Sequence, residues 1–192
     1  MAGIRLHEIA QPGQPVASAG FESPFEMLSA CHERVERMLG LLGRIREHVA
    51  THGADAQARQ AAQDVMRYFD LAGPLHHQDE ELHVFPPLLA QRDPAVVAVV
   101  IRLRQDHREM EAQWTQVRVA LAVLVEAAGR PDAGWPGFSA VEQQRFDAYD
   151  ALYRRHLVDE EGVAYPAART LIRGEGLKAM SADMMARRGV TG

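Results

Sequence analysis

The stretch HHQDEELHVFP (76–86) is repeated eighty residues later as HLVDEEGVAYP (156–166). Both copies follow the pattern H-x-x-D-E-E-x-x-x-(F/Y)-P, and agreement at six positions with one offset indicates an internal repeat rather than chance. In each copy a His and a Glu are four residues apart, so on a helix they lie one turn apart on the same face. An imidazole nitrogen and a carboxylate can then reach the same ion. The repeat therefore predicts two helices that each carry a pair of metal ligands.

The sequence around the two copies predicts further amphipathic helices, because apolar residues recur at steps of three and four. Capping boxes that start with Ser23 and Ser139 and a capping residue at Asp93 mark three of the helix starts. No segment shows the alternation of a strand. The predicted helices run from Ser23 to about Val49, from Asp55 to before Gln91, from Asp93 to before Gly129 and from Ser139 to before Gly174. We expect an all-α fold, an antiparallel up-down-up-down four-helix bundle.

Domain boundaries follow from the same pattern. Residues 1–22 are rich in Gly, Pro and Gln and lack a helical period, so we expect an N-terminal arm. Residues 23–173 form one helical domain, which a chain of 192 residues is long enough to fill with a core. In the tail over 174–192, a short Met-rich helix and an irregular chain are both open alternatives.

Two further histidines interrupt apolar helix faces. His32 in the first predicted helix and His107 in the third each stand where a leucine would be expected. In an up-down bundle, counting residues from the helix ends brings them to within roughly 6 Å of the depth of Glu80 and Glu160. Buried carboxylates and imidazoles need compensation, which a pair of cations supplies. The predicted metal ligands are His32, His76, Glu80, His107, His156 and Glu160.

This donor set contains nitrogen and oxygen and no thiolate, which favours iron or manganese over structural zinc. The spacing does not choose between the two metals. Two ions with two imidazoles each and bridging carboxylates would accept further ligands, such as water, an oxo or hydroxo bridge, O2, NO or peroxide.

Several nearby side chains have roles that the sequence leaves open. His83 and Glu111 are either additional ligands or, more simply, a core histidine and a charge at the bundle margin. His77 lies about 100° off the ligand face, so we expect it at the surface or at a helix interface. Asp79 and Asp159 are either acceptors that orient imidazole N–H groups or surface residues.

Composition excludes several classes of protein. A net charge of -5 and few aromatic residues argue against a nucleic-acid partner. No apolar segment reaches the length of a membrane span, and the first residues lack a secretory apolar region. The single cysteine, Cys31, fits a reducing compartment. We therefore expect a cytoplasmic protein whose oligomeric state the sequence does not reveal.

The order H, H-x-x-x-E, H, H-x-x-x-E over residues 23–173 resembles the hemerythrin-like HHE cation-binding domain family. The resemblance implies an antiparallel four-helix bundle with a carboxylate-bridged non-haem di-iron centre. The oxygen-carrying members have a second His where this chain has Glu111, and they use H-x-x-x-x-D on the last helix. These departures favour the bacterial hemerythrin-like proteins and the di-iron proteins of iron-sulfur cluster repair. The repair proteins usually carry an N-terminal cysteine-bearing module, of which this sequence shows no sign.

Three functions are compatible with these residues. The leading hypothesis is a non-haem di-iron protein that binds or reduces a small oxidant (O2, NO or peroxide) in sensing or in detoxification under oxidative stress. The alternatives are an iron donor for iron-sulfur cluster repair and a metal-stabilised regulatory or interaction module. Whether the protein is an enzyme stays open.

Overall fold

The computed structural model describes residues 20–130 and 134–190, and most of the predicted N-terminal arm lies outside them. The described part of the chain is helical and contains no strand, which confirms the all-α prediction. No helix in this part is long and apolar enough to cross a membrane. The helices are α2 (Pro24–His52), α3 (Ala56–Asp79), η1 (Glu80–Val84), α4 (Phe85–Ala90), α5 (Pro94–Ala128), α6 (Ala140–Asp159), η3 (Glu160–Ala164), α7 (Tyr165–Leu171) and α8 (Glu175–Arg187).

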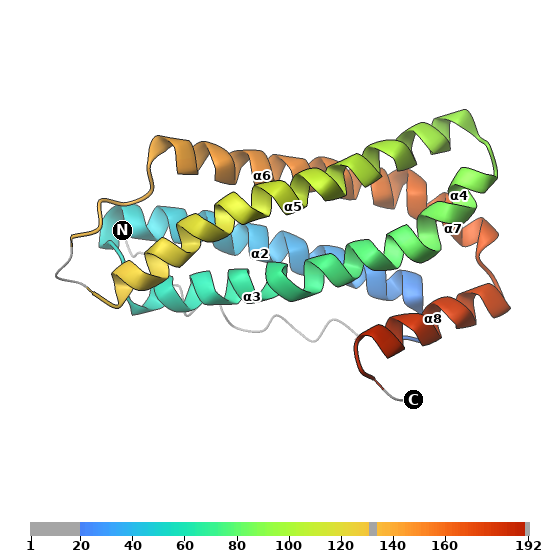
Figure 1. The fold of residues 1–192 in the computed structure, drawn as a ribbon, viewed down its shortest axis with the longest axis horizontal. Helices are drawn as coiled ribbons and strands as arrows, with labels where there is room; N and C mark the ends of the chain where they lie inside the picture. The colour runs from blue at the N-terminus through green and yellow to red at the C-terminus, as the bar shows by residue number, and fades with distance from the viewer. Residues whose placement is uncertain (1–19, 131–133, 191–192) are drawn as a thin grey trace, which may run out of the picture.

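The four long helices lie side by side along the longest axis of the molecule, and consecutive ones run in opposite directions (Figure 1). The helix α2 contacts α3 and α6, and α5 contacts α3 and α6. The C-terminal tail contains the additional helix α8, which packs against α2 and α3. Its residues Met180 and Met184 are buried. The tail is therefore part of the packed structure.

The helix starts are only partly those that the sequence predicts. Ser139 and Glu142 form the expected reciprocal capping box. Asp93 caps α5 by accepting a hydrogen bond from the backbone. At the start of α2, however, the Ser23 side chain makes no capping hydrogen bond. Glu26, its predicted partner, pairs with Arg169 of α7 at 2.6 Å, so a tertiary contact replaces the predicted box.

Two of the predicted helices are not continuous. Each contains a five-residue π-helical segment, η1 or η3, which begins at Glu80 or Glu160. In each segment the backbone N–H of the residue after it, Phe85 or Tyr165, bonds to the carbonyl of that glutamate. The next residue in both cases is a proline, which has no N–H to donate. Such π turns widen the helix and are frequent at functional sites.

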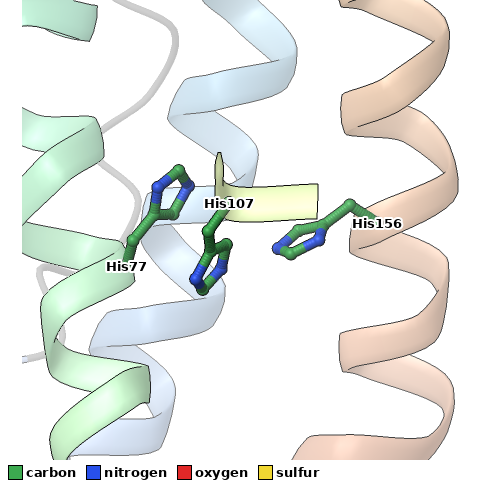
Figure 2. Close-up of side chains that lie close together, drawn as sticks. All are labelled: His77, His107 and His156. Carbon is green, nitrogen blue, oxygen red and sulfur yellow. The ribbon is translucent and has the colours of Figure 1, made fainter. Parts of the chain in front are cut away.

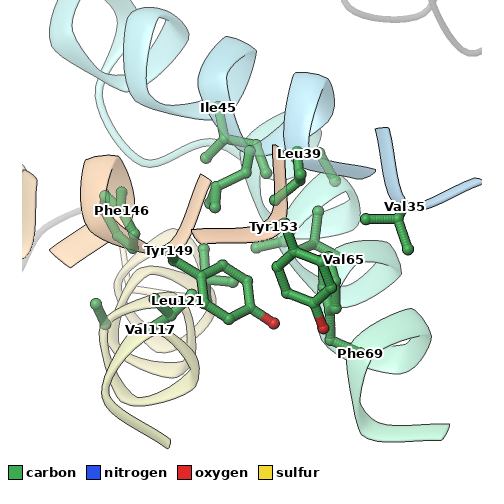
Figure 3. Packing of buried hydrophobic residues seen from close by; sticks show 14 of the residues in the cluster. Val35, Leu39, Ile45, Val65, Phe69, Val117, Leu121, Phe146, Tyr149 and Tyr153 are labelled. Carbon is green, nitrogen blue, oxygen red and sulfur yellow. The ribbon is translucent and has the colours of Figure 1, made fainter. Parts of the chain in front are cut away.

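The buried apolar residues form two clusters. The larger one, part of which is shown in Figure 3, includes Val35 of α2, and the second includes Leu28 of the same helix. His32 lies between these two residues, and it is buried. On α5, buried His107 likewise lies between Leu103 of the second cluster and Met110 of the larger one. The predicted ligands therefore occupy a polar layer between two apolar ones.

Candidate metal centre

The structure brings all six predicted ligands together. They form two groups, in each of which one donor atom per residue lies within 4.8 Å of the others. Position A consists of His32, His76, Glu80 and Glu160, and position B consists of Glu80, His107, His156 and Glu160. All six side chains are buried. Their role as metal ligands stays a prediction, but their convergence at one depth is a feature of the fold.

The two carboxylates belong to both positions because each divides its oxygen atoms between them. Glu80 Oε1 lies 3.5 Å from His76 Nε2, and Glu80 Oε2 lies 3.4 Å from His107 Nε2. Glu160 Oε2 lies 3.1 Å from His32 Nε2, and Glu160 Oε1 lies 2.8 Å from His156 Nε2. Each carboxylate therefore places one oxygen at position A and the other at position B.

Several of these atoms lack a hydrogen-bond partner among the described residues, although they are fully buried. They are Glu80 Oε2, both carboxylate oxygens of Glu160 and the Nε2 atoms of His107 and His156. Buried polar atoms are rarely left without a partner, because this costs on the order of 1–3 kcal/mol each. A cation between them would satisfy lone pairs from both residue types at once. The residues present therefore fit a cation at each position.

Two acidic side chains accept hydrogen bonds from ligand imidazoles, and a third lies close to another imidazole. The Nδ1 of His32 donates to Glu161 Oε1 at 2.7 Å, and the Nδ1 of His107 donates to Glu81 Oε1 at 3.2 Å. The Nδ1 of His156 lies 3.5 Å from Asp106 Oδ2. A proton on Nδ1 leaves the Nε2 lone pair free for a metal, and such contacts fix the orientation of the ring. The sequence analysis did not select any of these three residues.

The candidates that the sequence did offer for this role, Asp79 and Asp159, are not in contact with an imidazole. Buried Asp79 pairs with Arg187 and Arg188 of the C-terminal tail, both at 2.6 Å. Asp159 pairs with Arg102 at 2.7 Å. The imidazoles of His32 and His107 are oriented instead by the second glutamate of each D-E-E triplet, which comes after the residue that opens the π turn. The repetition of that glutamate in both copies was the available signal.

The aromatic residue near the end of each copy also contacts the centre. Phe85 stacks on His107 with ring centroids 5.5 Å apart, and Tyr165 stacks on His32 at 5.2 Å. The two halves therefore act in the same way. Each repeat copy supplies one glutamate that belongs to both positions. Each copy also supplies a second glutamate that orients a histidine of another helix and an aromatic ring that stacks on the same histidine. The first copy acts on His107 of α5, and the second acts on His32 of α2.

His77 lies at a helix interface, one of its two predicted locations, and it reaches the centre. Its ring stacks on that of His107 with centroids 4.0 Å apart and an angle of 11°. Figure 2 shows His77, His107 and His156 converging from α3, α5 and α6, and their donor atoms form a third close group. Burial and the charge of His107 hold the pKa of His77 well below its usual value, so the imidazole is neutral.

The other two open candidates lie elsewhere. His83 Nε2 bonds to Asp183 Oδ2 of α8 at 2.7 Å, so it is neither a ligand nor a partner of one. Glu111 is exposed and is in neither ligand group. It is one of the residues that line a cavity.

That cavity, of about 320 Å³, lies between α3, α5 and α6 and reaches His107. Its walls are mainly aromatic, with Phe69, Trp114, Tyr149 and Tyr153, and His77 is also among its lining residues. Polar side chains such as Gln78, Glu81 and Arg108 complete the lining. The cavity is therefore lined by one residue of position B.

The charges of the metal-free centre compensate one another. Burial and the charge of Glu160 raise the pKa of Glu80 to about 7. Burial opposes the charge on Glu160, but His156 and the other imidazoles hold its pKa well below the usual value. Burial would lower the pKa of His32, yet the neighbouring carboxylates of Glu160 and Glu161 raise it to about 10. For His156, the Glu160 charge outweighs burial and raises the pKa to about 9. At neutral pH His32 and His156 are therefore protonated, and Glu80 is close to its pKa.

Comparison with known proteins agrees with this geometry. The hemerythrin family, described as the hemerythrin HHE cation binding domain, matches residues 23–168. The chain is also 28% identical over 177 residues to a Haemophilus influenzae protein described as uncharacterized, a match that covers 92% of this chain and 96% of the relative. The family match takes in both copies of the repeat and all six predicted ligands. The chain belongs to the family of hemerythrin HHE cation-binding domains.

Proposed function

We propose that this protein holds two iron ions, one at position A and one at position B, and uses them to bind or reduce a small oxidant such as O2, NO or peroxide. The observation that carries the proposal is the division of the Glu80 and Glu160 oxygens between the two positions. A nitrogen and oxygen donor set without thiolate suits iron, with manganese as the other candidate. The family of cation-binding domains supports the same chemistry.

The protein supplies four donors at each position, fewer than an octahedral ion accepts. An oxo or hydroxo bridge and an external small ligand would complete the two shells. When bound, the iron pair would supply the electrons and the binding positions for the oxidant. The chain itself fixes the ions through Glu80 and Glu160, orients His32 and His107, and keeps the centre away from bulk water.

The cavity supports position B as the place where the oxidant binds. It leads to His107, and its aromatic walls admit small apolar molecules more readily than ions. His77 lines this cavity and stacks on His107. A neutral imidazole there can donate a hydrogen bond to a ligand at position B. The functional context we propose is sensing or detoxification of the oxidant.

Metal analysis with an optical spectrum of the aerobically purified protein tests the proposal. We expect two iron ions per chain and near-ultraviolet absorption from a bridged ferric pair. His76→Ala should lose iron from position A. His83→Ala is the matched control, because this histidine lies on the same helical segment and pairs with Asp183. One zinc ion per chain, or equal metal loss in both variants, would overturn the proposal.

The cavity also favours a second candidate function, the delivery of iron for iron-sulfur cluster repair. An acceptor that reaches position B could remove one ion and leave the other. Timed iron release to a small chelator separates the candidates. A donor releases iron quickly and stays folded, whereas a metal-stabilised regulatory or interaction module unfolds when the metal leaves. An oxidant-binding centre keeps its iron on this timescale.

A further inference from the structure

Tyr165 is the aromatic residue of the second repeat copy, and the sequence analysis did not select it as a ligand. Its side chain is 1% exposed and stacks on His32 with an angle of 14° between the rings. Its hydroxyl oxygen lies 3.1 Å from His32 Nε2 and makes a short hydrogen bond to Glu80 Oε1. Both of these atoms are proposed donors at position A. The phenol therefore contacts the atoms that would bind the ion, on the side where the ion would sit.

The distances around His32 Nε2 are those expected of neighbouring ligands. Donor atoms at about 2.1 Å from an ion and at right angles to each other lie about 3.0 Å apart. His32 Nε2 lies 3.1 Å from His76 Nε2 and 3.1 Å from Glu160 Oε2. The Tyr165 oxygen, also at 3.1 Å, stands in the same relation to His32 as these two proposed ligands.

Position B differs at the equivalent place. Phe85 occupies the matching site of the first copy of the repeat and stacks on His107, but it has no oxygen to offer. The cavity reaches His107 and His77 of this half, whereas none of its lining residues is a histidine of position A or Tyr165. The two positions therefore differ chemically. Position A lies beside the phenol of Tyr165, whereas position B lies beside the cavity.

We propose that Tyr165 is a fifth protein ligand at position A, where it binds a ferric ion through its phenolate oxygen. In this step the O–H bond breaks, the proton passes to water, and the oxygen donates a lone pair to the ion, so no electron changes hands. Phenolate is a known ligand of ferric iron in proteins. The additional ligand fills position A and directs external ligands to position B. The inference rests on the proposed iron centre.

Resonance Raman spectroscopy of the ferric protein, together with iron analysis, tests this inference. We expect a visible absorption band from charge transfer between phenolate and iron, and tyrosine ring modes that are enhanced when this band is excited. Tyr165→Phe should lose both signals and keep two iron ions per chain. Tyr153→Phe is the control, because this buried tyrosine lies beside His77 and lacks contact with position A.

The outcomes separate the inference from the proposed function. A wild-type protein that contains two iron ions but shows no enhanced tyrosine modes overturns the inference and leaves the iron centre standing. The same holds if the band survives in Tyr165→Phe or disappears equally in Tyr153→Phe. A protein without iron overturns both. The wild-type spectrum decides the question even if a variant fails to fold.

Discussion

Glu161 accepts a hydrogen bond from His32 Nδ1 at 2.7 Å, so a residue of the second repeat copy fixes an imidazole carried by the first helix. The carboxylate holds the tautomer in which Nε2 faces position A. Loss of such an orienting contact typically weakens metal binding by about 10- to 100-fold. We expect a loss of this size in Glu161→Ala, measured by competition with a chelator.

Asp159→Ala is the matched control for this prediction. Asp159 lies two residues earlier on the same helical segment, and its partner is the surface residue Arg102. Its removal should leave metal affinity within about twofold of the wild type, since surface ion pairs contribute only about 0–1 kcal/mol. An equal loss of affinity in both variants would assign the orienting role elsewhere.

The paired arginines of the C-terminal tail should matter for stability. Asp79 is fully buried, and both of its partners, Arg187 and Arg188, come from the tail. Removing the partners of a buried charge costs about 3–5 kcal/mol, and some water access to the arginines favours the lower end. We expect the double variant Arg187→Ala/Arg188→Ala to lose this much free energy of unfolding in urea.

Adding Asp79→Asn to that double variant should recover most of the loss, because no buried charge then remains unpaired. Arg102→Ala is the control, because it removes the exposed partner of Asp159. This variant should lose no more than about 1 kcal/mol of unfolding free energy. If Asp79→Asn gave no recovery, packing of the tail rather than compensation of its charge would be the cause.

Metal uptake should release protons. The pKa values of His32 and His156 in the metal-free protein are raised to about 10 and about 9, so both imidazoles are protonated at pH 7. A cation requires the neutral rings, so its affinity should rise with pH up to about 10. Calorimetric titration with Fe2+ under anaerobic conditions, in buffers of different ionisation enthalpy, counts the protons released. Uptake without proton release would contradict the proposed ligands.

The same shifts predict how the stability of the metal-free protein depends on pH. Histidine in an unfolded chain has a pKa of about 6.5. A raised pKa in the folded state stabilises it fully below that value, and the contribution disappears as the pH passes through about 9 to 10. We expect the metal-free protein to unfold at lower urea concentration at pH 10 than at pH 7. Glu161→Ala should reduce this difference, because it removes one cause of the His32 shift.

Filling the cavity should slow the reaction at position B. Gly73 lines the cavity, and an added Cβ there would meet only Tyr153 and Phe69, at 3.8 and 4.0 Å. Gly73→Leu would project a larger side chain into the cavity. Stopped-flow mixing of the reduced protein with NO should then show slower binding at unchanged iron content. Gly43→Leu, on α2 with no atom near its Cβ, is the control and should bind NO at the wild-type rate.

The convergence of the six predicted ligand residues could be expected from the sequence because their signals are local. His32 and His107 interrupt apolar faces, and the spacing of His76 and Glu80 is a property of any helix. The assumption of a regular helix also explains why the sequence analysis did not select the orienting residues Glu81 and Glu161. The π turns after Asp79 and Asp159 change the register of the helix, so an ideal helix does not show which residue faces the opposite imidazole.

Other features depend on contacts between distant parts of the chain. Asp79 pairs with arginines more than a hundred residues away, and no pattern near Asp79 reveals them. His77 stacks on a residue of α5, a contact that depends on how two helices cross rather than on its angle from the ligand face. Glu26 likewise pairs with Arg169 instead of forming the predicted capping box with Ser23. Helical periodicity sets which residues face inward, but long-range partners decide what each of them does.

The sharing of Glu160 between positions A and B has a consequence for biosynthesis. A nascent chain that has left the ribosome only as far as Ala128 contains His32, His76, Glu80 and His107, yet neither position is complete. If the two positions hold cations as proposed, neither could have its full set of donors until the second repeat copy has been translated and has docked. Completion of the proposed centre would therefore depend on assembly of the whole bundle.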